Sequence, residues 1–439
     1  MAFPISVSGS AIKQVRSLTI GTFVAQLLVL ASSPWISRLY SPEEFATYGL
    51  FASFVLVGSI IMTAGYDAAI PLPKEDGDAR ALLRSVLQLC LIWTLVGTLC
   101  IASIHERFHP VWIGLPLAIG LHGAMQVWTQ WTLRTEQINT QAWSKVAMSA
   151  VLVSTQLVGG RGGLGSFGLI IGYILGRVVS IGIQRDSLLQ DGAKDSFEGG
   201  KHTFSWHKMS LGLQNQRRVL KEYIQQPMFV MPSSLLSMAA KEVPVFLVAA
   251  WFSQELLGQY SFAYRILAAP ATLLAMSLGA IFTQRAAKRV QEQQVLGVWV
   301  QKLWGSLAGT AFLPFLMIGL FGKPLFTWVF GEPWAVAGEL SQWLSLMLFL
   351  QFITLPTSRI LMVIGAAKWQ PISSGIDLFV RILALWFGYT QGGAFAEPGF
   401  LGAIQTMVIA QALVQIGNLI LIWSITKAYD RNVKHNGKQ

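Results

Sequence analysis

The sequence predicts an all-α membrane protein of about twelve transmembrane helices, organised as two repeats of six. Hydrophobic residues make up 53% of the 439 residues and charged residues only 12%, with a positive mean hydropathy. A soluble protein of this length needs more polar surface than that. Apolar stretches of about 20 residues, separated by charged clusters, recur along the whole chain, which is the helix length that crosses the hydrocarbon core. Alternating β-barrel strands do not fit the pattern.

The charge distribution predicts the orientation of these helices. The predicted spans are residues 17–38, 43–65, 81–103, 111–133, 141–160, 164–184, 226–250, 257–283, 298–321, 336–364, 370–391 and 399–425. With the N-terminus in the cytoplasm, and with residues in the first or last five positions of a span assigned to the adjacent side, 23 of the 32 Lys and Arg residues fall on the inner side, 4 on the outer side and 5 within spans. The positive-inside rule then places both termini in the cytoplasm. The net charge of +11 therefore reflects topology, and we expect no nucleic-acid binding.

The chain divides around one long loop. We expect an N-terminal six-helix lobe at residues 1–184, a cytoplasmic linker at 185–225, a C-terminal six-helix lobe at 226–427 and a cytoplasmic tail at 428–439. The second part of the linker, WHKMSLGLQNQRRVLKEY, mixes apolar and basic residues. That pattern predicts a basic amphipathic helix on the anionic inner leaflet, and a plain solvated linker is the alternative. The N-terminus shows no signal-peptide cleavage site, so the first span is expected to be retained.

A weak internal repeat supports the two-lobe organisation. A shift of 212 residues aligns residues 40–54 with residues 252–266, both in the outer turn between the first and second spans of a six-span unit. The identical pairs are Ser41 with Ser253, Glu43 with Glu255, and Tyr48 with Tyr260. Two parallel repeats of this kind are a transporter architecture in which the substrate site lies between the halves.

Glycines of the sixth span repeat every fourth residue. Gly168, Gly172 and Gly176 therefore share one helix face. Small residues at this spacing predict close packing against a neighbouring helix.

No pattern predicts catalysis or metal binding. The six histidines are scattered without an HExxH or another metal-ligand spacing, and a Walker motif is missing. Cys90 and Cys100 fall about 15 Å apart along one predicted helix, which is too far for a disulfide. We therefore expect neither an enzyme nor a cofactor.

Charges within the seventh and eighth spans are the candidate substrate-binding residues. Lys241 and Glu242 lie in the seventh span and Arg265 in the eighth. A charged side chain deep in a span costs about 3 kcal/mol on insertion scales, so it normally faces a cavity or a partner. A guanidinium matches phosphate oxygens and a lysine adds a point charge, which predicts an anion site at Arg265 and Lys241. A structural neutralisation of Glu242 by Lys241 is the alternative.

Four further charged residues in or near the spans are less favoured as site residues. Asp377 and Arg381 stand four residues apart, so an intrahelical ion pair is the expectation, with Arg381 a second candidate for substrate binding. Arg177 is expected to extend to the inner interface. Asp67, at the inner end of the second span, is either a gate residue paired with a cation or an ordinary interface acid.

Three sequence blocks resemble the polysaccharide flippases of the multidrug/oligosaccharidyl-lipid/polysaccharide exporter superfamily, which includes O-antigen and capsule repeat-unit flippases. They are GTFVAQLLVLASSPWISRLYSPEEFATYGLF near the N-terminus, GYDAAIPLPKEDGDARALL after the second span, and FVMPSSLLSMAAKEVPVFLVAAWFSQELLGQYSFAYRILAAP in the seventh and eighth spans. The resemblance implies two six-helix lobes forming a V around a cationic cavity. It also places Arg265 and Asp67 in recurring blocks.

The resemblance implies a flippase of the bacterial inner membrane that moves undecaprenyl-diphosphate-linked oligosaccharides by alternating access, for O-antigen, capsule or exopolysaccharide synthesis. Its implied partners are the polyprenyl-diphosphate-linked glycan, membrane lipids, a polysaccharide polymerase and a chain-length regulator. Arg265, Lys241 and Arg381 would bind the diphosphate, and Asp67, Glu242 and Asp377 would couple or gate. The alternatives are a cation-coupled multidrug exporter of the same superfamily and an integral-membrane glycan polymerase or ligase. The outer loops are short for a polymerase or ligase.

Overall fold

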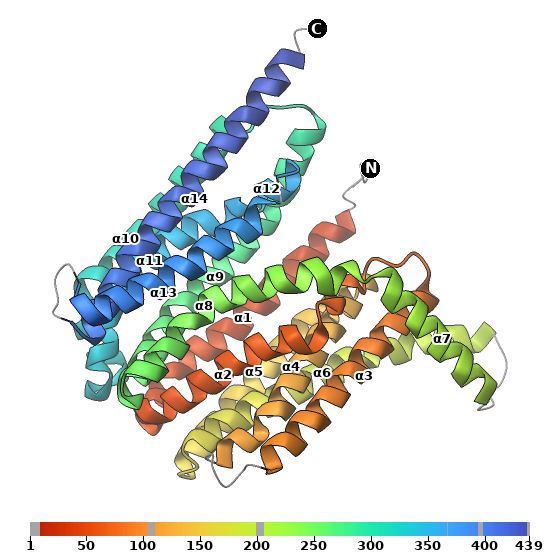
Figure 1. Cartoon of the computed structure of the whole chain (residues 1–439), viewed down its shortest axis with the longest axis horizontal. Coiled ribbons are helices and arrows are strands. Elements are labelled where there is room, and N and C mark those ends of the chain that lie inside the picture. The colour runs from red at the N-terminus through yellow and green to blue at the C-terminus, as the bar shows by residue number, and fades with distance from the viewer. Residues whose placement is uncertain (1–8, 104–109, 199–205, 367, 394–397, 437–439) are drawn as a thin grey trace. The chain divides into compact units, whose positions relative to one another are not determined.

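The computed structural model describes residues 9–103, 110–198, 206–366, 368–393 and 398–436, and within them the chain is helical with no strand (Figure 1). The all-α prediction is therefore confirmed. The α-helices are α1 (Gly9–Leu39), α2 (Pro42–Thr63), α3 (Asp76–Ser103), α4 (Leu115–Arg134), α5 (Ile138–Arg161), α6 (Ser166–Glu198), α7 (Trp206–Glu222), α8 (Met231–Trp251), α9 (Gln254–Gln291), α10 (Gly297–Phe330), α11 (Ala335–Ser358), α12 (Ile360–Val363), α13 (Trp369–Gln391) and α14 (Phe400–Asn436). Short 3₁₀ or π turns join some of them, at Tyr66–Ala69 (η1), Pro110–Gly114 (η3), Gln226–Val230 (η4) and Glu332–Trp334 (η5).

Ten helices in the described part of the chain are long and apolar enough to cross a membrane. These ten correspond to ten of the twelve predicted spans. The remaining two predicted spans form the long helices α5 and α9, which fall outside this group. In α5, the polar residues Gln141, Lys145 and Gln156 lower the hydropathy. Membrane crossing by α5 and α9 therefore stays a prediction.

The chain forms two compact units. Unit 1 comprises Met1–Ser32 and Phe51–Leu235, and unit 2 comprises Ser33–Leu50 and Leu236–Gln439. The facing ends of α1 and α2, with the turn between them, thus pack with the C-terminal helices. The predicted lobe boundaries are not tested by this division.

Unit 1 contains the close packing that its glycines predict. A Cβ on Gly172 would lie 2.9 Å from the carbonyl oxygen of Leu152, and one on Gly176 would lie 2.9 Å from that of Met148. Neither position therefore has room for a side chain, and α6 packs directly on the backbone of α5. The packing role predicted for these two glycines is confirmed.

Aromatic side chains hold residues 33–50 in unit 2. Phe45 lies edge-on to Phe262 of α9 and to Trp334 of η5, with ring centroids 5.1 Å apart in each case. The Trp334 indole N–H donates to the Ser37 carbonyl at 2.9 Å. Buried aromatic pairs of this kind add stability beyond the area they bury, and here the polar group is also satisfied.

The repeat identified in the sequence has a local structural cause. Ser41 and Glu44 form a capping box at the start of α2, and the Ser253 hydroxyl accepts a hydrogen bond from the Leu256 amide at the start of α9. The matched serines therefore both occupy helix N-caps. Gly49 and Ser261, which are 212 residues apart, also face each other, because a Cβ on Gly49 would lie 2.7 Å from the Ser261 hydroxyl.

Candidate functional site

Unit 2 contains a polar cavity of about 210 Å³ among α8, α11, α13 and α14. Eleven of its fifteen lining side chains are polar or charged: Ser237, Lys241, Gln351, Thr354, Ser358, Gln370, Ser373, Ser374, Asp377, Gln415 and Asn418. A cavity lined in this way inside helices of membrane-spanning length favours water or a hydrophilic ligand, because unpartnered polar groups in hydrocarbon are costly.

The spacing of polar residues in each helix creates the cavity. In α13, Gln370, Ser373, Ser374 and Asp377 are separated by three or four residues and share one face. Ile372, Ile376 and Phe379 of the same helix are exposed apolar side chains of the kind that faces lipid. The same spacing recurs in α11 (Gln351, Thr354, Ser358), α14 (Gln411, Gln415, Asn418) and α8 (Ser237, Lys241).

Hydrogen bonds between the helices fix the cavity walls. The hydroxyls of Ser237 in α8 and Ser374 in α13 are 2.8 Å apart, and the Ser373 hydroxyl donates to the Asn418 side-chain oxygen of α14 at 2.7 Å. These bonds hold α13 between its two neighbours. The polar face of α13 therefore has a fixed orientation toward the cavity.

The ion pair predicted between Asp377 and Arg381 is present. Arg381 Nε lies 3.2 Å from Asp377 Oδ2, and the Arg381 side chain is 3% exposed while that of Asp377 is 17% exposed. Asp377 lines the cavity and Arg381 lies behind it, outside the cavity lining. The guanidinium thus neutralises the carboxylate from the buried side.

The layer behind Asp377 has unused hydrogen-bonding capacity. Asp377 Oδ1, Arg381 Nη1 and Gln411 Oε1 are buried without a partner among the described residues. The Gln411 amide nitrogen meanwhile lies 3.4 Å from the Asp377 carbonyl. A buried unsatisfied group costs about 1–3 kcal/mol, so this layer gains stability from any rearrangement that supplies partners.

Lys241 and Arg265 occupy different environments within unit 2. Lys241 is exposed and lines the cavity, whereas Arg265 is half-buried and lies outside the lining. The Arg265 guanidinium lies 5.0 Å from the centroid of the Tyr48 ring, a cation–π contact. Neither cation forms an ion pair within the described part of the chain. The structure therefore does not bring the two predicted anion-binding residues together.

Glu242 is half-buried beside the polar region of α9. Its carboxylate lies within electrostatic range of the hydroxyls of Tyr260 and Tyr264, and so does the Arg381 guanidinium. Glu242 therefore contributes to the same charged region as Asp377 and Arg381.

Asp67 belongs to unit 1, in the turn η1. The backbone turns sharply just before it, with positive φ at Ala64 and Gly65. Burial raises the pKa of Asp67, and hydrogen bonds from the Thr63 side chain and from the backbone amides of Asp67 and Ala68 act in the opposite direction. No cation among the described residues forms an ion pair with it. Its gating role stays a prediction.

The loop after Asp67 is held by an arginine clamp. Arg134, the last residue of α4, donates from Nη1 to the Pro73 carbonyl at 2.6 Å, and its Nη2 lies 2.7 Å from Asp76 Oδ1. Part of the sequence block GYDAAIPLPKEDGD is thus explained by a loop-fixing contact.

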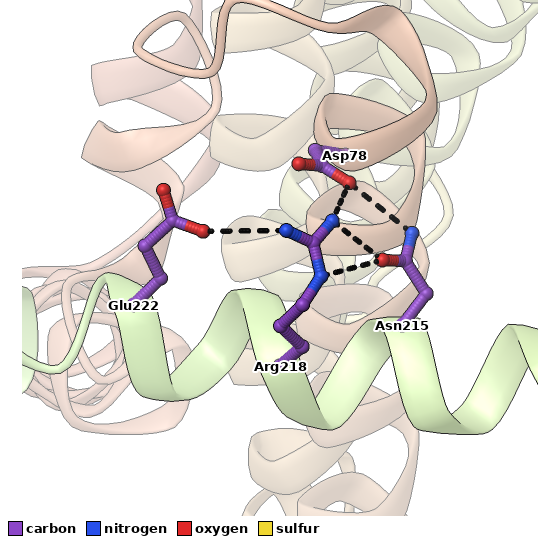
Figure 2. Close-up of polar contacts among 4 residues, drawn as sticks. All are labelled: Asp78, Asn215, Arg218 and Glu222. Carbon is purple, nitrogen blue, oxygen red and sulfur yellow. Dashed lines mark hydrogen bonds and ion pairs between the residues drawn. The ribbon is translucent and has the colours of Figure 1, made fainter.

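Within unit 1, the helix α7 packs on α3 next to this loop. Arg218 Nη2 forms an ion pair with Asp78 at the start of α3 and a hydrogen bond with Asn215, and Glu222 lies 3.8 Å from its Nη1 (Figure 2). Val219 is fully buried in the same hydrophobic cluster as Leu82. The linker therefore includes a helix, and this helix packs on protein along one face.

The prediction that Arg177 extends to the membrane interface is wrong. Arg177 is only 8% exposed. Its Nε donates to His122 Nδ1 at 3.2 Å, and its guanidinium carbon lies 3.1 Å from the centroid of the Tyr173 ring. The cause is that His122 of α4 and Tyr173 of α6 supply partners for the guanidinium inside unit 1. Sequence analysis did not identify His122 as its neighbour, because the two residues are 55 positions apart.

This chain is similar in fold to solved transporter structures. An inward-facing multidrug resistance MATE family transporter of the MOP superfamily has 17% identity and a TM-score of 0.68, over 92% of this chain and 96% of that chain. An outward-facing multidrug resistance MATE family transporter of the MOP superfamily has 17% identity and a TM-score of 0.62, over 97% of this chain and 96% of that chain. A MOP superfamily transporter from Pyrococcus furiosus has 15% identity and a TM-score of 0.61, over 95% of each chain.

The chain is therefore a multi-pass membrane protein with the fold of the MOP superfamily transporters. Residues 202–339 match a family model described as a polysaccharide biosynthesis protein. The resemblance to the polysaccharide branch of this superfamily is thus supported by the fold and by a family match over part of the chain. No curated protein matches the sequence.

Proposed function

We propose that this protein is a flippase that translocates polyprenyl-diphosphate-linked oligosaccharides across the bacterial inner membrane by alternating access. The observation that carries the proposal is the cavity of unit 2, where hydroxyl, amide and charged side chains line a space inside helices of membrane-spanning length. Nine of the lining side chains carry hydroxyl or amide groups, which an apolar drug does not need as partners. A glycan, by contrast, presents hydroxyls that need polar partners.

Arg265 is the proposed contact for the diphosphate. Its guanidinium is oriented by the Tyr48 ring and forms no ion pair among the described residues, so its donors remain available for phosphate oxygens. Lys241 and Arg381 were the other candidates. Arg381 already pairs with Asp377, so any contribution from it would act through that carboxylate.

Three acids are the proposed coupling or gating groups. Asp377 and Glu242 lie in the charged region of unit 2, and Asp67 lies in unit 1. Protonation of any of these carboxylates removes one negative charge from its unit. It can therefore change the relative stability of the conformations that this unit adopts.

The test is translocation in proteoliposomes containing a lipid-diphosphate oligosaccharide, with glycan exposure on the two leaflets measured over time. We expect the wild type to translocate this lipid and Arg265→Ala to do so at least tenfold more slowly. Arg265→Lys keeps the charge but loses the paired donors, and we expect an intermediate rate.

Arg289→Ala is the matched control, because Arg289 also belongs to α9 and also stacks on an aromatic ring, with 5.3 Å from its guanidinium carbon to the Trp299 centroid. We expect normal translocation from it. A wild type that moves no lipid-linked glycan contradicts the proposed function. Equal rates for the two alanine variants place the diphosphate site elsewhere.

A multidrug exporter of the same superfamily is the second candidate, since the solved structures cited above include drug transporters. Drug efflux by the reconstituted protein, without glycolipid translocation, would favour it.

A further inference from the structure

The cavity of unit 2 has the chemistry of a sugar-binding subsite with one uncompensated cation. Most of its lining side chains are hydroxyls and amides, which both donate and accept hydrogen bonds, as sugar hydroxyls do. Its volume of about 210 Å³ has room for a sugar ring beside these side chains.

The charges select an anionic ring. Arg381 neutralises Asp377 from behind, and Glu242 lies outside the cavity lining. Lys241 is therefore the charged lining side chain that has no ion-pair partner among the described residues. A metal cation finds oxygen ligands here, but the positive charges of Lys241 and Arg381 oppose its binding. A diphosphate favours several cationic or paired donors, whereas a single carboxylate is matched by one ammonium.

From these observations we infer that the cavity binds a single sugar ring bearing a carboxylate, a hexuronate, with the carboxylate on Lys241 and the ring hydroxyls on the side chains of α13 and α14. This inference rests on the proposed flippase function and specifies which part of the glycan unit 2 recognises. Ser374 and Asn418 are already bonded across helices and fix the walls, while Asp377 and Gln415 face the ring.

The experiment compares two lipid-diphosphate oligosaccharides that differ in one residue, a hexuronate in one and the corresponding neutral hexose in the other. We expect the wild type to translocate the acidic glycan about tenfold faster at limiting substrate. Lys241→Met keeps the side-chain length without the charge and should lower the rate for the acidic glycan much more than the rate for the neutral glycan, so that the preference is lost. Lys241→Arg should retain the preference.

Lys302→Met is the matched control, because Lys302 is exposed on α10 and lies outside the cavity lining. It should keep the wild-type preference. Equal wild-type rates for the two glycans overturn the inference. An equal loss for both glycans in Lys241→Met also overturns it, since Lys241 then serves the diphosphate or the fold. A wild type that moves neither glycan contradicts the proposed function instead.

A binding measurement does not depend on translocation. Sodium glucuronate, glucose and sodium chloride are added separately to the purified full-length protein, and the thermal midpoint is recorded. We expect glucuronate to raise the midpoint of the wild type more than the other two, and this difference to disappear in Lys241→Met. Equal stabilisation by sodium chloride identifies a cation effect and overturns the inference.

Discussion

Two arginines are buried in the described part of the chain, Arg177 in unit 1 and Arg381 in unit 2, and they are held in different ways. Arg177 packs on the Tyr173 ring and bonds to His122 and to the Tyr173 carbonyl. Arg381 has a carboxylate partner that itself lines a cavity, and its Nη1 is unsatisfied among the described residues. The first arrangement is closed by neighbouring side chains, and the second borders a space that a ligand can enter.

The difference teaches that a charge within a spanning helix is not by itself a sign of function. What separates the two regions is the cavity and the unused hydrogen-bonding capacity behind its wall. A closed network stabilises one packing arrangement, whereas a partly satisfied one is stabilised further when a ligand brings polar groups.

The largest expected effect is on unit 2 stability when Arg381 is removed. Arg381→Met leaves the Asp377 carboxylate without its cation in a mostly buried position, which we expect to cost about 3 kcal/mol. The measurement is the thermal midpoint of the purified protein. Adding Asp377→Asn to Arg381→Met should recover much of the loss, because the uncompensated charge is then gone. No recovery in the double variant would mean that Arg381 stabilises unit 2 by packing alone.

Arg177→Met should have a smaller effect, of about 2 kcal/mol, from the lost cation–π contact and the lost hydrogen bonds. The comparison variant is Lys241→Met. The Lys241 side chain is exposed to the cavity, so this substitution should change the thermal midpoint little. If Arg177 has only a structural role, folded Arg177→Met protein should translocate the glycan at the wild-type rate. A lower thermal midpoint for Lys241→Met than for Arg177→Met would reverse the contrast drawn between the two units.

The helices could be predicted from the sequence because each one depends only on residues that are close together in the chain. Apolar stretches of membrane-spanning length report helices one at a time, and the Asp377–Arg381 pair lies within one helix turn of a single helix. The glycine spacing of α6 likewise marks a packing face without knowledge of the partner helix.

The cavity was not predicted because it depends on helices far apart in the sequence. Lys241 and Asp377 were identified separately, but only the fold shows that they line the same space. Arg177 was misjudged for the same reason, since His122 lies on another helix. The polar residues at helical spacing in α11 and α14 were a usable signal, because such a stripe in an apolar helix needs a polar environment.

The smallest expected effect concerns Asp67, the acid of unit 1 that, unlike Asp377, has no cation partner among the described residues. Burial raises its pKa above the usual 3.8, so the folded protein binds this proton more tightly than the unfolded chain. The stability of the fold therefore decreases as the pH rises from about 3.8 through the raised pKa, because the buried carboxyl group loses its proton over this range. Asp67→Asn should match the wild-type thermal midpoint near pH 4 and exceed it at pH 8. Asp76→Asn, which removes an exposed partner of Arg134 in the same loop, should give no such gain at either pH. A wild type that is more stable than Asp67→Asn at pH 8 would show that the ionised carboxylate is stabilised in the fold, as a gate residue with a cation partner would be.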